Sequence, residues 1–193
     1  MSEEVKFKNV GLRGITVADT KISFIDGEQG ILIYRGYRIE DLAEKSTFEE
    51  TAYLLLHGLL PSDAQLKEFS SQLAGAREVP AFVTESLSKW PRDAHPMDVL
   101  QASIPILAMT DPDLHNDSRD ANMRKAVRII ARLPVLVAAW HRIRNGLEPL
   151  RPDGSLSHAG NFLWLLHGTE PDELAARGLD VCLILHADHT FNA

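Results

Sequence analysis

The residue types best suited to chemistry gather in the run LILHADHTFNA, near residue 193. Cys182, His186 and His189 are spaced i, i+4 and i+7, so a helix continuing through them would carry all three on one face. Asp188 adds a carboxylate and Asn192 an amide. An imidazole titrates near neutral pH, and it can bind a metal or donate hydrogen bonds to an anion. This cluster is the first candidate for a functional site.

The spacing leaves three interpretations of the cluster open. A metal site would need a thiolate and neutral imidazoles converging on one ion, normally with a further ligand from elsewhere in the chain. An anionic substrate would instead accept hydrogen bonds from the imidazoles, with Asn192 as a further donor and Asp188 tuning the protonation of the rings. The third interpretation is a polar helix end that binds nothing.

The other histidines have structural interpretations. His57 and His167 each precede a glycine where a helix is expected to end, and a cation there suits the helix dipole. His95 precedes Pro96 at an expected helix start. The sequence has no phosphate-binding G-x-x-x-x-G-K-[ST], no G-x-G-x-x-G after a strand and no G-x-S-x-G elbow.

The composition is that of a globular protein. Of the 193 residues, 45% are hydrophobic and 24% are charged, which suffices for one large core. The formal net charge of −7 argues against nucleic acid as the main partner. A single cysteine excludes an internal disulfide, and no apolar run approaches the ~20 residues of a membrane-spanning helix. We therefore expect a soluble, cytoplasmic protein that binds neither nucleic acid nor membranes.

One short β-like region precedes the elements expected to be helical. The runs KISFID and GILIYRG predict a hairpin at about 21–36, with Asp26-Gly27 as turn residues. Ser46 with Glu49, and Ser62 with Gln65, have the spacing of capping boxes that open helices. Helices are expected at about 38–45, 46–57, 62–75, 80–88, 96–109, 118–145 and 156–166, and from Pro171 onward. The predicted fold class is all-α and multi-helical, with a small N-terminal β-hairpin.

The longest expected helix, Ser118 to Asn145, has unusual apolar patterning. A heptad-like seam and a second apolar stripe make its C-terminal half hydrophobic nearly all round. Such a helix must be covered on several sides, either by its own domain or by a partner subunit. In the preceding helix, Pro105 removes one backbone hydrogen bond and predicts a kink.

Four stretches carry a resemblance to a known family. They are ISFIDGEQGILIYRGYRIEDLAEKSTFEETAYLLLHGLLP, AHPMDVLQAS, LSHAGNFLWLL and LILHADHTFNA. In order and separation they resemble the N-terminal half of citrate synthases of the bacterial and archaeal type, which includes 2-methylcitrate synthases. The resemblance covers Gly11 to Ala193. It implies that residues 1–193 form the N-terminal portion of the family's large helical domain, and that the small domain covering coenzyme A is absent.

The resemblance also implies a function and site residues. Family members condense acetyl-CoA with oxaloacetate to citrate and coenzyme A, an acyl-to-alkyl transfer of the tricarboxylic acid cycle, with no metal and no cofactor besides the substrate acetyl-CoA. The histidine matching His189 hydrogen-bonds oxaloacetate, the one matching His186 lies beside that site, and Asn192 matches a residue near the same pocket. No residue of this chain matches the family's catalytic triad, so we expect the chain alone to be inactive.

The resemblance implies partners as well. The family places helices matching about 96–109 and 118–145 at a homodimer interface, and a C-terminal-half chain is a further expected partner. One alternative is a non-catalytic helical dimerisation module or one half of a split synthase. Another is a small metal-binding helical protein that uses Cys182, His186 and His189.

Overall fold

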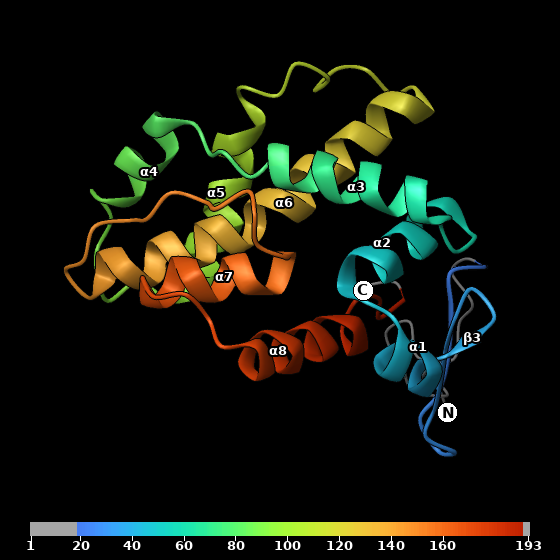
Figure 1. The fold of residues 1–193 in the computed structure, drawn as a ribbon. Coiled ribbons are helices and arrows are strands. Elements are labelled where there is room, and N and C mark those ends of the chain that lie inside the picture. Colours follow the sequence, from blue (N-terminus) through green and yellow to red (C-terminus); the bar gives the residue numbers. More distant parts are fainter. Residues whose placement is uncertain (1–18, 191–193) are drawn as a thin grey trace, which may run out of the picture.

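The computed structural model describes residues 19–190, which form a small sheet and a set of helices (Figure 1). Strands β1 (Ser23–Asp26), β2 (Ile31–Tyr34) and β3 (Tyr37–Arg38) pair antiparallel in that order. The predicted hairpin is confirmed, and β3 extends it. A tight turn joins β2 to β3 through Arg35 and Gly36, both at positive φ (50° and 93°), as a type I′ hairpin turn requires.

The helices are α1 (Ile39–Lys45), α2 (Phe48–His57), α3 (Asp63–Gly75), α4 (Ala81–Leu87), α5 (Pro96–Ala108), α6 (Arg119–Arg144), α7 (His158–His167) and α8 (Glu173–Leu185). The predicted all-α class with a small N-terminal sheet is therefore confirmed. α6 is the central helix and packs on α3, α4, α5 and α7. α7 also packs on α8, while α1 and α2 join α8 to the sheet (Figure 1). This arrangement brings the C-terminal end of α8 next to the N-terminal strands.

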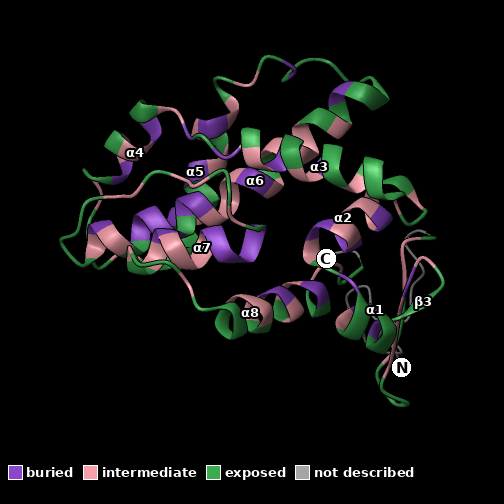
Figure 2. Cartoon of the chain, viewed as in Figure 1, coloured by how far each residue is buried: buried purple, intermediate pink, exposed green. Residues whose placement is uncertain are grey.

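The buried residues, purple in Figure 2, form separate hydrophobic clusters. The largest lies between α4, α5, α6 and α7 around Leu136 and Trp140. A second joins the sheet to α1, α2 and α8 around Tyr34, Leu54 and Ile184. The C-terminal half of α6 is buried at six positions between Val135 and Ile143, which explains its all-round apolar sequence. Among residues 19–190, no helix is both long and apolar enough to cross a membrane.

One predicted cap is wrong and another is confirmed. Ser46 does not open α2; it closes α1, and Thr47 accepts the backbone N–H of Glu50 at 3.2 Å as the N-cap. Glu49 turns away from the cap because its carboxylate accepts the backbone N–H of His158 on α7 at 2.7 Å. A long-range bond thus displaces the local capping box. By contrast, the capping box of Ser62 opens α3 as predicted.

The start of α8 differs from prediction by two residues. Asp172 is the N-cap and accepts the backbone N–H groups of Leu174 and Ala175 at 2.8 and 3.2 Å. Pro171 therefore lies just before the cap instead of at the first helical position. An aspartate that satisfies two otherwise unpaired amide groups stabilises this register.

Candidate functional site

The segment from His186 to Thr190 leaves α8 and is fixed against the sheet. Tyr34 on β2 is fully buried, and its hydroxyl lies 3.3 Å from the carbonyl oxygen of Leu185 and 3.1 Å from that of Asp188. The backbone N–H of Asp188 in turn donates to this hydroxyl at 3.2 Å. One buried phenol therefore positions the backbone on which both candidate histidines stand.

The carboxylate of Asp188 adds a second attachment to the sheet. It accepts a hydrogen bond from the Ser23 hydroxyl on β1 and another from the backbone N–H of Thr190 at 3.1 Å. Both bonds hold the chain, and no bond joins this carboxylate to an imidazole among residues 19–190. The predicted role of Asp188 in tuning the rings is therefore replaced by a role in positioning the segment.

His186 is the C-cap of α8 and is exposed. Its Nδ1 lies 2.7 Å from the carbonyl oxygen of Cys182, one turn earlier. A carbonyl can only accept, so Nδ1 carries the proton and the ring's position is set by its own helix. Nε2 has no hydrogen-bond partner in the described part of the chain, and the exposed ring offers it to a ligand.

His189 lies outside the helix, and the predicted shared face of Cys182, His186 and His189 is wrong. α8 ends at Leu185 because the bonds from Tyr34 draw the following residues onto the sheet. His189 is exposed, and between 19 and 190 its ring has no hydrogen-bond partner. Asn192, the third predicted site residue, lies outside the described residues.

The metal-binding interpretation does not fit this geometry. In the described range, no three His, Cys, Asp or Glu side chains come close enough together to hold a metal ion. The Nδ1 of His186 is committed to the Cys182 carbonyl, and the break in the helix takes His189 off the common face. Two exposed imidazoles on a fixed segment can instead donate hydrogen bonds to an anion, as the second interpretation requires.

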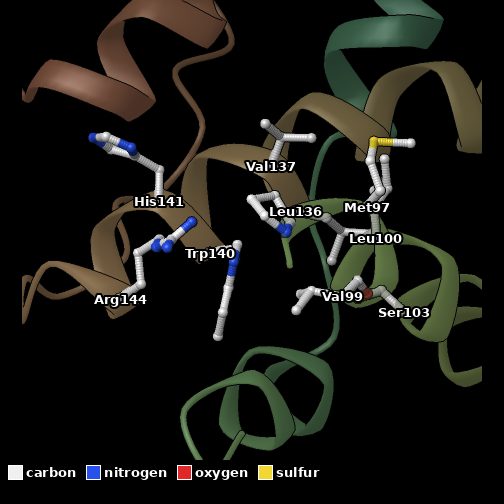
Figure 3. Close-up of a pocket in the computed structure, with 10 residues that line it drawn as sticks. Met97, Val99, Leu100, Ser103, Leu136, Val137, Trp140, His141 and Arg144 are labelled. Atoms are coloured by element: carbon white, nitrogen blue, oxygen red, sulfur yellow. Dashed lines mark hydrogen bonds between the residues drawn. The ribbon is translucent and has the colours of Figure 1, made fainter. Parts of the chain in front are cut away.

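A second feature is an apolar groove of about 200 Å³ between α5 and α6 (Figure 3). Met97 and Leu100 line it from α5, and Leu136, Val137 and Trp140 line it from α6. His141 and Arg144 form its polar end. Met97 is 62% exposed and Val137 38% exposed, so apolar side chains of both helices face outward here.

A third feature is a buried polar cluster that the sequence analysis missed. His158 stacks on Phe48, with ring centroids 4.7 Å apart, and its Nδ1 has no partner within the described residues. Burial, together with the charge of nearby Arg77, lowers the pKa of His158 to about 4. The Arg77 guanidinium is itself buried and donates to the carbonyl oxygen of Asp153 at 2.6 Å. The cluster joins α2 to α7.

Sequence reasoning also missed Ser23 and Tyr34, which hold the histidine segment in place. Tyr34 falls in a run correctly predicted as a strand, but no local pattern indicates that its hydroxyl binds a segment 154 residues away. Of the three predicted site residues, His186 and His189 are exposed on the same segment, and Asn192 lies outside the described residues.

Comparison with known proteins places the chain in a family. The family model described as "Citrate synthase, C-terminal domain" matches residues 11–193. The chain belongs to the citrate synthase family. A citrate synthase from Synechocystis is 42% identical over 193 residues, which are all of this chain and 48% of that protein. A 2-methylcitrate synthase from Mycobacterium tuberculosis is 40% identical over 95% of this chain and 46% of its own length.

Solved structures of the family have the same fold. The crystal structure of a citrate synthase from Pyrobaculum aerophilum matches 93% of this chain with a TM-score of 0.86 and 40% identity, and the match covers 47% of that chain. A Thermotoga maritima citrate synthase gives a TM-score of 0.81 at 36% identity. The chain spans about half the length of the family members it matches.

Proposed function

We propose that residues 1–193 are the N-terminal portion of a citrate-synthase-type acyltransferase and that they hold oxaloacetate through His186 and His189. The main support for this proposal is the fixed, exposed segment that follows α8. Both imidazoles belong to this segment, and its backbone is held in place by Tyr34 and Asp188. Donors fixed before the substrate arrives lose little entropy on binding, which favours recognition of a dicarboxylate. Asn192 is proposed as a further contact near the same pocket.

The proposed reaction joins acetyl-CoA to oxaloacetate and then hydrolyses the thioester. A proton leaves the methyl group of acetyl-CoA, and the resulting enol attacks the ketone carbon of oxaloacetate. The ketone oxygen takes up a proton to become the hydroxyl of citrate, and water releases coenzyme A. Imidazole donors on oxaloacetate would polarise its ketone or neutralise its carboxylates as charge develops.

The catalytic groups for proton removal are proposed to come from the part of the family members that has no counterpart among residues 1–193, on the same polypeptide or on another. The match to about half of each relative supports this, because the remaining half of those proteins is available to supply these groups. We further propose that the chain forms a homodimer through α5 and α6, where the apolar groove lies. A cytoplasmic location accords with its single, exposed cysteine.

The test measures coenzyme A release from acetyl-CoA and oxaloacetate. Three samples are assayed separately, with propionyl-CoA as a second acyl donor: residues 1–193 alone, the part of the Synechocystis citrate synthase that the match does not cover, and the two co-expressed polypeptides. Release only by the co-expressed pair is the expected result. If the pair is retained together but stays inactive with both donors, the enzymatic proposal is wrong.

A non-catalytic dimerisation module is the second candidate function. The α5–α6 groove favours it, because a module needs an apolar surface and no substrate. A chain that dimerises, but neither retains a second-half polypeptide nor binds oxaloacetate in calorimetry, would have this function instead.

A further inference from the structure

The turn that ends α6 contains the dipeptide Asn145-Gly146, and no other asparagine of the sequence is followed by a glycine. Asn145 is the C-cap of α6, and both residues are exposed. Glycine has no side chain, so nothing bulky separates its backbone nitrogen from the side chain of the preceding asparagine. The two groups can therefore react with each other wherever the backbone brings them together.

The backbone closes this turn as a Schellman motif. The N–H of Gly146 donates to the carbonyl oxygen of Ile143 at 3.0 Å. The N–H of Leu147 donates to the carbonyl oxygen of Arg142 at 2.8 Å. Gly146 has a φ of +76°, the left-handed conformation that the motif favours at this position. The fold therefore favours a glycine here, and the same glycine makes the preceding asparagine reactive.

Hydrogen bonds occupy both groups of the dipeptide while the turn is closed. The side-chain amide of Asn145 donates to the carbonyl oxygen of His141 at 2.7 Å, one turn earlier on the helix. The backbone N–H of Gly146 is bonded to Ile143. This nitrogen must give up its bond before it can attack the Asn145 side chain, so the reaction proceeds from an opened turn. Helix ends open more readily than the interior of a core, which makes such an opening accessible.

We propose that Asn145-Gly146 is a site of spontaneous covalent modification, controlled by the opening of the Schellman motif that ends α6. In the open turn, the Gly146 nitrogen attacks the side-chain carbon Cγ of Asn145. A C–N bond forms and the bond from Cγ to the amide nitrogen breaks. Ammonia leaves with the proton that the glycine nitrogen gives up, and a five-membered succinimide ring remains. Water then opens the ring at either carbonyl and leaves aspartate or isoaspartate at position 145.

The product no longer fits the end of α6. A carboxylate at position 145 cannot donate to the carbonyl oxygen of His141, and it adds negative charge at the negative end of the helix dipole. In isoaspartate the main chain runs through the former side chain and is one carbon atom longer. The spacing between Ile143 and Gly146 then changes, so the backbone bonds of the motif are lost.

The same turn fastens α6 to α7. Arg142, whose carbonyl accepts the N–H of Leu147, donates through its guanidinium to the carbonyl oxygens of Glu148 at 2.6 Å and Leu166 at 3.2 Å. Glu148 follows the turn directly, and Leu166 lies near the end of α7. Modification of Asn145 therefore loosens a contact between two core helices, and we expect it to lower the urea midpoint of the chain.

The experiment incubates the folded chain and a synthetic peptide of residues 141–150 side by side at pH 8. Mass spectrometry follows the loss of each side-chain amide, and enzymatic methylation detects isoaspartate. Because the bonds of the turn must open first, Asn145 should convert roughly 10- to 100-fold more slowly in the chain than in the peptide. It should still convert faster than Asn122, which is exposed on the same helix and precedes a methionine.

Two substitutions at Leu147 test the control by the turn. Leu147→Pro deletes the N–H that donates to Arg142 and leaves Asn145-Gly146 unchanged, so Asn145 should convert roughly fivefold faster than in the wild type. Leu147→Ala keeps the N–H and is the matched control. Equal rates in the two variants, with both folded by circular dichroism, would overturn the proposal. If Leu147→Pro does not fold, the comparison between chain and peptide decides, and equal rates there would overturn it.

Asn145→Gln tests the consequence of the modification. Glutamine keeps the side-chain amide, but its ring would have six members and forms much more slowly. After the same incubation, the urea midpoint should fall for the wild type and stay constant for Asn145→Gln. An equal fall in both proteins, or an Asn145 that converts no faster than Asn122, would contradict the assignment of this site.

Discussion

At the scale of single residues, His189 gives the most direct test of the substrate site. His189→Ala in the co-expressed pair removes an imidazole that donates to a carboxylate substrate, a contact worth about 1.5–3 kcal/mol. We expect kcat/KM for oxaloacetate to fall roughly 10- to 100-fold. His115→Ala, another exposed histidine in the loop before α6, is the control. Unchanged oxaloacetate kinetics would remove His189 from the site.

Tyr34 is expected to act through the segment it holds. Tyr34→Phe deletes the hydroxyl that bonds the backbone of Leu185 and Asp188, which leaves polar groups unpaired at a cost of about 1–2 kcal/mol. Urea unfolding should show this loss, and oxaloacetate KM should rise in the co-expressed pair. Tyr37→Phe, on a tyrosine that is 39% exposed, should change neither quantity. Equal behaviour of the two variants would show that the hydroxyl does not position the segment.

His158 makes the stability of the chain depend on pH. Burial and the charge of Arg77 lower the pKa of His158 from 6.5 to about 4. At a pH between these two values, the imidazole is protonated in the unfolded chain and neutral in the folded chain. The free energy of unfolding is therefore unaffected by His158 above pH 6.5. It decreases as the pH falls toward 4, by about 3 kcal/mol in total. Urea unfolding at pH 7.5, 5.5 and 4.5 measures it. His158→Gln should flatten this dependence, and an identical slope in both proteins would contradict the assignment.

At the scale of elements, replacing a glycine by alanine should change the free energy of unfolding in opposite directions at the end of α7 and inside α8. Gly168 ends α7 at φ +74°, and a Cβ there would lie 3.3 Å from Leu150, so Gly168→Ala should cost about 1–2 kcal/mol. Gly178 lies inside α8 in open space, so Gly178→Ala should add about 1 kcal/mol of stability. Chemical denaturation of the two variants measures whether each substitution raises or lowers the free energy of unfolding. The same sign for both would show that backbone conformation does not govern these positions.

Elements whose ends depend on nearby residues were predictable from the sequence. Ser62 and Gln65 close a cap within four residues, and the glycines after α2 and α7 adopt the left-handed conformation that ends a helix. The predicted helix ends were wrong where a contact with a residue far away in the sequence sets the end of the helix. Glu49 leaves the expected cap for the backbone of His158, 109 residues away, and Tyr34 holds the segment that leaves α8 at Leu185. The sequence therefore indicated which residue types form the candidate site, whereas the positions of those residues depend on the sheet.

At the scale of the whole molecule, the apolar groove and the segment of His186 and His189 lie on different helices, because α7 packs between α6 and α8. None of the residues that line the groove belongs to that segment, so a second copy can cover the groove without contacting His186 through it. This separation allows the proposed dimer contact to be removed without a change in the candidate substrate site.

The dimer is tested by placing a charge in the groove. Met97 is 62% exposed in the single chain, so Met97→Glu should leave folding unchanged but put a carboxylate into an apolar interface. Sedimentation velocity should show a wild-type dimer and a dissociation constant at least tenfold higher for the variant. Leu59→Glu, at a residue that is 74% exposed between α2 and α3, should dimerise like the wild type. If Met97→Glu associates as tightly as the wild type, the subunits meet elsewhere, and the groove needs another occupant.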